Sequence, residues 1–154
     1  MKSIIESVRE YFLKCPYLED DVRLSVDFLG DQPLEYGIYS EPLNPTIKKY
    51  VDGDELKQFG FIFTTRSHMS GDLVTQLENS AFFDDLVEWI QEQNYKEIYP
   101  DLEGERYPTK LEVVTNGYLS SAETGSSQYQ IQMRLVYMEV NNGWRYNNTK
   151  FKRI

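Results

Sequence analysis

Two strong signals lie next to each other in residues 57–94, KQFGFIFTTRSHMSGDLVTQLENSAFFDDLVEWIQEQN. Phe59, Phe61 and Phe63 fall on every second position, which predicts a half-buried strand with one aromatic face. After a turn, apolar residues recur at helical spacing from Leu73 onward, which predicts a long amphipathic helix. We expect the rest of the chain to cover this strand and this helix.

Before this stretch, the sequence predicts a helix followed by strands. Ser3 and Glu6 have the spacing of a capping box, so a first helix should begin there and end before Pro16. Alternating apolar residues predict a strand over residues 22–28, and a second strand is expected over residues 34–40.

After it, the sequence predicts a loop and then a long antiparallel hairpin. Residues 95–109 are polar and interrupted by proline and glycine, which predicts a surface connector. Strands are expected over residues 111–119, with a bend at Gly117, and over residues 129–137, where the period-two alternation is most regular. The small polar residues 120–128 between them predict a mobile hairpin tip.

These elements predict an α+β fold: two helices and a mainly antiparallel sheet of about four to five strands, with a break in the second helix near Asn79–Ser80. A chain of 154 residues fits a single domain, 1–154, with residues 141–154 as a flexible tail. The residues expected in the core are Val8, Phe12, Val26, Phe28, Phe61, Phe63, Leu77, Phe82, Leu86, Trp89, Val113, Ile131, Met133 and Leu135.

The charge of the chain is negative and unevenly distributed. A net charge of −9 argues against a protein that works by nonspecific binding to nucleic acid. The last ten residues carry four basic and no acidic side chains, so the remainder carries −13. Two interpretations of this basic end stay open: contact with an acidic neighbour, such as another copy, or a solvated terminus. The 12 tyrosines likewise fit either strands or a protein interface.

Few residues are candidates for chemistry. Cys15 is the single cysteine, so no internal disulfide forms, and without a nearby histidine it is expected to be a buried apolar side chain. His68, the only histidine, lacks the partners of a metal site or a catalytic triad. Asp52, Asp54 and Glu55 resemble a calcium loop in composition alone. We therefore expect no catalytic residue, no cofactor and no metal.

The sequence also bears on where the protein folds. Its first residues form an amphipathic pattern with charged side chains, unlike a secretory signal. No apolar run approaches the roughly 18 residues that a membrane span needs. We expect a protein that folds in a cytoplasm and has no membrane partner.

Four segments resemble a known family: KKYVDGDELKQFGFIFTTR at residues 48–66, LENSAFFDDLVEWIQEQN at 77–94, TNGYLSSAE at 115–123 and YQIQMRLVY at 129–137. They resemble small proteins encoded in the tail module of tailed phages and prophages of Gram-positive bacteria, which are variously labelled minor capsid, tail completion or tail terminator proteins. The resemblance runs from about Cys15 to Tyr137, and the part after Val140 departs from it.

The resemblance implies a structural virion protein rather than an enzyme. It implies a tail-terminator-like fold, in which two helices pack on one face of a mainly antiparallel sheet. It also implies a hexameric ring that caps the finished tail tube and joins it to the head connector. The partners would be other copies of the chain, the tail tube protein and the head-tail connector protein, with DNA only passing through the lumen. The protein would be found in the virion, at the head-tail junction, after assembly in the host cytoplasm.

Candidate contact residues come from a loop, the hairpin tip and the basic end. They are Lys48, Tyr50, Asp52, Glu55, Ser121, Glu123, Ser126, Arg145 and Lys150. Two other classes of function stay open. One is a head-side minor capsid or adaptor protein, and the other is a small enzyme that uses His68 or Cys15.

Overall fold

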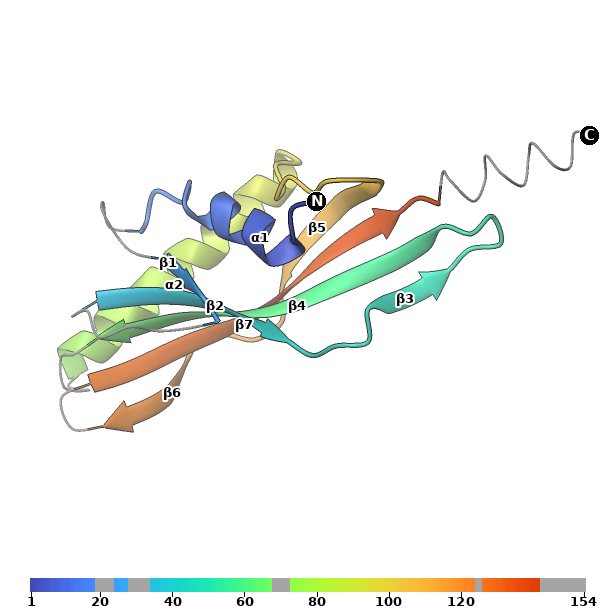
Figure 1. Cartoon of the computed structure of the whole chain (residues 1–154). Coiled ribbons are helices and arrows are strands. Elements are labelled where there is room, and N and C mark those ends of the chain that lie inside the picture. The colour runs from blue at the N-terminus through green and yellow to red at the C-terminus, as the bar shows by residue number, and fades with distance from the viewer. Residues whose placement is uncertain (19–23, 28–33, 68–72, 124–125, 142–154) are drawn as a thin grey trace, which may run out of the picture.

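The structure is a computed structural model, and it describes residues 1–18, 24–27, 34–67, 73–123 and 126–141. This described part contains two helices and one mixed sheet of seven strands. The elements are α1 (Ile4–Phe12), β1 (Leu24–Val26), β2 (Leu34–Glu41), β3 (Thr46–Lys49), β4 (Glu55–Ser67), α2 (Leu73–Tyr95), β5 (Arg106–Val113), β6 (Tyr118–Glu123) and β7 (Ser126–Glu139). Both helices lie on the same face of the sheet (Figure 1).

The seven strands fill five positions side by side. Their order is β1-β2-β4-β7-β5, while β3 continues the β2 position along β4 and β6 continues the β5 position along β7. The central β4–β7 ladder pairs residues from Glu55–Glu139 to Ser67–Ser127. All pairings are antiparallel except β1–β2. The predicted α+β class is confirmed, while the strand number is higher than expected because two of the five positions are each divided into two strands, β2 with β3 and β5 with β6.

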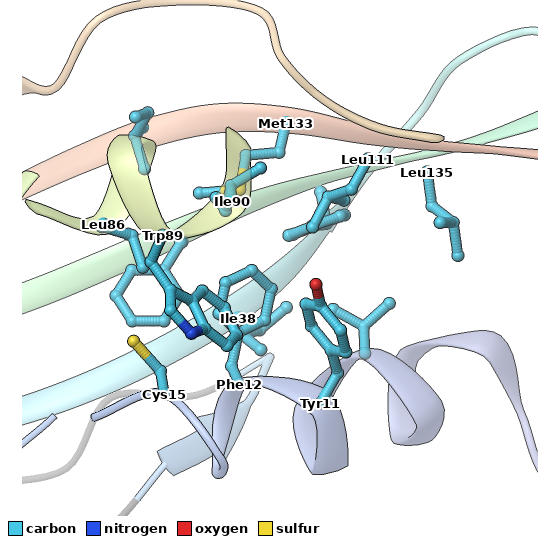
Figure 2. Packing of buried hydrophobic residues seen from close by; sticks show 14 of the residues in the cluster. Tyr11, Phe12, Cys15, Ile38, Leu86, Trp89, Ile90, Leu111, Met133 and Leu135 are labelled. Atoms are coloured by element: carbon cyan, nitrogen blue, oxygen red, sulfur yellow. The ribbon is translucent and has the colours of Figure 1, made fainter. Parts of the chain in front are cut away.

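The core lies between the sheet and the two helices, and Phe12 joins all three. Its ring centroid lies 5.3 Å from that of Phe63 on β4 and 5.9 Å from that of Trp89 on α2. Figure 2 shows Phe12, Tyr11 and Cys15 directed from α1 and the turn after it toward the other layers. The period-two placement of aromatic rings on β4 therefore positions both helices on one face.

Most of the expected core residues are buried: Val8, Phe12, Phe61, Phe63, Leu86, Trp89, Ile131, Met133 and Leu135. Phe82 and Val113 are partly buried against this core, and Val26 is also intermediate. Phe28 and the side chain of Leu77 lie outside the described residues.

The first helix forms where the capping box predicts it. The Ser3 side chain accepts a hydrogen bond from the backbone N–H of Glu6 at 3.3 Å, and α1 ends at Phe12, before Pro16. The strand over 34–40 is also confirmed. Of the strand predicted over residues 22–28, the described residues show β1 only.

The predicted break near Asn79–Ser80 is wrong, because α2 is continuous from Leu73 to Tyr95. Ser80 is exposed. A serine at an exposed helix position costs only a few tenths of a kcal/mol relative to a strong helix former. A weak local preference of this size does not interrupt a helix that buries one side against a sheet.

Two predicted loops are partly strands. β5 begins at Arg106, inside the predicted connector 95–109, and it accommodates Pro108 because it is an outer strand with a register shift between Pro108 and Lys110. The expected mobile tip is also wrong over most of its length, since β6 runs to Glu123 and β7 begins at Ser126. Pairing with β7 orders the small polar residues of β6.

Candidate interaction surfaces on two edges of the sheet

The structure separates the predicted contact residues into groups. Lys48, Tyr50, Asp52 and Glu55 lie together on β3 and the turn that leads into β4. This end of the sheet extends beyond the helices (Figure 1). We call residues 46–54 the β3 tip.

The other predicted contact residues do not join the β3 tip. Ser121, Glu123 and Ser126 belong to β6 and β7, at the far end of the β4–β7 ladder. With 12 residue steps between Glu55 and Ser67, the two ends are about 40 Å apart. The side chains of Ser121, Glu123 and Ser126 are not described, and Arg145 and Lys150 lie outside the described residues.

The β3 tip is built as a tight turn that exposes apolar and basic side chains. The backbone N–H of Tyr50 donates to the carbonyl of Asp54 at 2.9 Å, and Gly53 takes the positive φ of 94° that the turn requires. The Lys48 ammonium lies 5.2 Å from the centroid of the Tyr50 ring. Val51 is fully exposed. Ile47 and Tyr50 are also exposed, so several apolar side chains stand together on the tip, and a grouping of exposed apolar side chains marks a candidate contact surface.

The acidic residues of the turn are used within the fold. Asp52 accepts from the backbone N–H of Asp54 at 3.0 Å, and Asp54 accepts from the backbone N–H of Asn141 at 3.1 Å. Glu55 accepts from the Thr46 hydroxyl at 3.4 Å. In the described part of the chain, no group of three metal-ligating side chains is found. These three carboxylates therefore accept hydrogen bonds from the fold itself.

The opposite edge, formed by β5, β6 and the adjoining side of α2, is hollowed. One hollow of about 260 Å³ lies between α2 and β5, and one of about 300 Å³ lies between α2 and β6. A third, of about 560 Å³, is formed by residues 97–108, which link α2 to β5. We call this third one the connector hollow. Sequence reasoning placed no site here, although exposed Ile98 and Tyr107 are the kind of signal that marks one.

Where β5 faces α2, the backbone N–H and carbonyl of one residue already have hydrogen-bond partners within the chain. The Asn94 side chain donates from Nδ2 to the carbonyl of Leu111 at 2.7 Å and accepts from the Leu111 N–H at 2.9 Å. An asparagine amide thus replaces a neighbouring strand at this residue. Pro108 has no N–H to offer. Strand addition to β5 is blocked at both positions, so a partner at this edge has to bind through side chains.

The hollow between α2 and β6 contains an unusual polar group. Tyr129 lines it and is buried, and its hydroxyl has no hydrogen-bond partner among the residues that the structure describes. The ring of Phe83 and the backbone of Gly117 complete the wall. This hydroxyl is a cost to the fold, since burial removes it from water without replacing the lost hydrogen bond.

The face of the sheet opposite the helices carries polar side chains that bind one another. Arg134 donates to Glu112 and, at 2.8 Å, to Gln58. Gln130 donates to the Tyr118 hydroxyl at 2.6 Å. The Arg134 hydrogen bond is the main reason why the pKa of Glu112 lies below its ordinary value. Because these groups satisfy each other, this face fits a solvated surface.

The candidate nucleophile has the wrong environment. Cys15 is only 4% exposed and belongs to the hydrophobic core, and this burial raises the pKa of its thiol. A nucleophilic cysteine needs a lowered pKa and access to substrate. The expectation of a buried apolar side chain is confirmed for Cys15, and His68 lies outside the described residues.

A scan against protein-family models finds no matching family, and a search of curated proteins finds no similar protein. Among the helices of the described residues, none combines the length and the apolar character needed to cross a membrane. Function therefore has to be inferred from the two edges of the sheet and from the resemblance noted in the sequence.

Proposed function

We propose that this chain is a structural protein of a tailed phage or prophage, and that it forms a closed ring, a hexamer, on the end of the tail tube. One observation carries the proposal: the two edges of a single sheet present different surfaces. The β3 tip is protruding and exposes lysines and Val51, while the opposite edge is hollowed. A ring of identical subunits needs a contact of this heterologous kind, in which one surface binds a different surface of the next copy.

The segments that carry the family resemblance support the same role. Residues 48–66 span most of the β3 tip and β4, residues 77–94 lie in α2, and residues 115–123 and 129–137 fall in β6 and β7 and the loop before β6. The β3 tip lies mostly inside these segments and β6 lies wholly inside them, while the connector hollow, at residues 97–108, falls between the second and the third segment. Two helices on one face of a mainly antiparallel sheet also agree with a tail-terminator-like fold.

In this role the ring ends the growth of the tail tube and offers a surface to the head-tail connector protein. Its partners are other copies, the tail tube protein and the connector, and it resides in the virion at the head-tail junction. A net charge of −9 suits a lumen through which DNA passes without binding, because like charges repel. No catalytic residue, cofactor or metal is needed.

The test is the mass of the purified protein in solution, measured by light scattering over a range of protein concentrations, alone and with purified tail tubes. We expect a discrete sixfold mass, or a monomer that assembles on tube ends. A chain that stays monomeric and does not bind tubes would overturn the proposal.

Deletion of the gene from the phage separates two structural roles. A protein that terminates the tail leaves overlong tails when it is missing, and electron microscopy shows their length directly. Tails of normal length that fail to join heads would instead assign the protein to the head side, as a minor capsid or adaptor protein.

A further inference from the structure

We infer that one contact closes this ring: the β3 tip of one copy docks in the connector hollow of the next copy. The inference rests on the proposed ring and names the two surfaces that form it. The occupant of the hollow is a second copy of this chain, held by side chains rather than by added strands.

The two surfaces lie on opposite edges of the sheet, at the same position along the direction of the strands. Across the strands, Lys49 pairs with Glu55, Glu55 with Glu139, and Glu139 with Arg106. One row of paired residues therefore leads straight from β3 to the start of β5. Copies in a closed ring are related by rotation without a rise. When the strands run along the ring axis, the β3 tip of one copy meets the beginning of β5 in its neighbour.

The charges of the two surfaces are opposite. Lys48 and Lys49 are exposed on β3, and neither forms an ion pair among the described residues. Glu97 and Asp101 line the connector hollow, and residues 97–106 carry four acidic side chains against one basic. Complementary charge of this kind steers two copies together and fixes how they meet.

The apolar groups of the two surfaces also match. Val51 stands fully exposed next to Tyr50 on the tip. Ile98 and Tyr107, both about half exposed, line the hollow. A volume of about 560 Å³ has room for the side chains of both Tyr50 and Val51. Removing these groups from water supplies the hydrophobic part of the contact.

One competing occupant comes from the same chain. Val140 donates its N–H to the carbonyl of Glu105 at 2.8 Å, so a described residue close to the C-terminus lies near the hollow, and the basic residues of the segment 142–154 follow it in the sequence. The row of paired residues favours the β3 tip of a neighbour, and removing residues 142–154 tests the alternative.

The experiment reverses the charge of each surface in the full chain. One variant carries Lys48→Glu and Lys49→Glu, and the other carries Glu97→Lys and Asp101→Lys. We expect each variant to raise the dissociation constant of assembly at least tenfold. The constant is obtained from the mass as a function of protein concentration, or from the occupancy of tube ends. A 1:1 mixture should restore the ring, because the acidic tip of the first variant meets the basic hollow of the second, and the two unchanged surfaces also match.

The controls reverse equally exposed charges away from both surfaces: Lys14→Glu on the N-terminal side and Asp84→Lys with Asp85→Lys on α2. These should assemble like the wild type, and circular dichroism should show every variant folded. Higher salt should weaken the wild-type ring, since the attraction is screened.

The outcomes separate the two proposals. If the wild type assembles and the tip and hollow variants do so equally well, this contact is wrong while the proposed function stands. If removal of residues 142–154 abolishes assembly and the lysine variant does not, the hollow belongs to the chain terminus. If the wild type assembles neither alone nor on tail tubes, the proposed function is wrong, and this contact with it.

Discussion

Gly117 lies against the ring of Phe83 so closely that a Cβ at this position would be 2.5 Å from Phe83 Cδ2. Phe83 is only 4% exposed and cannot move aside without disturbing the core. The close approach lets the segment between β5 and β6 pack against α2. The sequence predicted one strand over residues 111–119 with a bend at Gly117, whereas β5 ends at Val113 and β6 begins at Tyr118, so this glycine lies between two strands.

We expect Gly117→Ala to lower the free energy of unfolding by about 1–3 kcal/mol, the usual effect of overpacking. Gly60→Ala is the matched control. A Cβ there would meet mainly the side chain of Leu43, which is 40% exposed, and would lie 3.2 Å from the carbonyl oxygen of Glu41, so we expect a smaller loss. Urea unfolding measures both, and equal losses would contradict this explanation.

Phe61 is fully buried between the sheet and α1. Phe61→Ala should cost about 3–5 kcal/mol of unfolding free energy, because it removes a large side chain and leaves a cavity. Val51→Ala, at a fully exposed position, should change stability by less than about 0.5 kcal/mol. A loss under about 1 kcal/mol for Phe61→Ala would be incompatible with the packing described for β4.

Two buried tyrosines should respond in opposite ways to loss of the hydroxyl. Tyr11 donates its hydroxyl to the carbonyl of Ile98 at 2.9 Å, so Tyr11→Phe should cost about 0.5–1.5 kcal/mol. Tyr129 has no such partner among the described residues, so Tyr129→Phe should be neutral or stabilising. Thermal unfolding of the two variants side by side gives the comparison, and a clear loss for Tyr129→Phe would mean that this hydroxyl has a partner.

The pair of Glu112 and Arg134 should make the stability of the fold vary with pH in the acid range. The pKa of Glu112 is lowered in the folded protein, mainly by the hydrogen bond from Arg134. A group with a lowered folded pKa stabilises the fold above its unfolded pKa, near 4.5, and this contribution is lost as the pH falls through the folded value.

Glu112→Gln should therefore flatten the decline in stability below about pH 4.5 and leave its shape near neutral pH unchanged. The urea midpoint measured at a series of pH values shows this directly. Asp84→Asn changes an exposed carboxyl on α2 and serves as the control. If stability falls equally with decreasing pH in Glu112→Gln and in the wild type, the ion pair between Glu112 and Arg134 does not cause the decline.

The sequence predicted best the elements that are buried on one face and solvated on the other. Residues 129–137 alternate because Tyr129, Ile131 and Met133 face the helices, while Gln130 and Arg134 face the opposite side. The same alternation located β4 and the core aromatic residues Phe61 and Phe63. A strand that is buried on one face alternates apolar and polar residues, and this alternation is visible in the sequence without a structure.

The outer strands were harder to predict for the same reason. At the start of β5 no side chain is buried, so the segment from Arg106 to Thr109 carries no apolar period, and Pro108 suggests a loop. β6 is held by pairing with β7, and its small polar residues have little strand preference of their own. The connector hollow was missed although residues 97–108 that form it are contiguous, because the sequence predicted only a surface connector there and does not show how that connector folds.

The order of the strands has a consequence for the synthesis of the protein. β7 pairs with β4, β5 and β6, yet it follows all of them along the chain. Until β7 is synthesised, β4 has one unpaired edge and β5 has no strand to pair with, so the connector hollow at the start of β5 does not yet have its final geometry. The sheet cannot close before the last strand is made. An incomplete copy would therefore lack a contact surface and would not be incorporated into a ring.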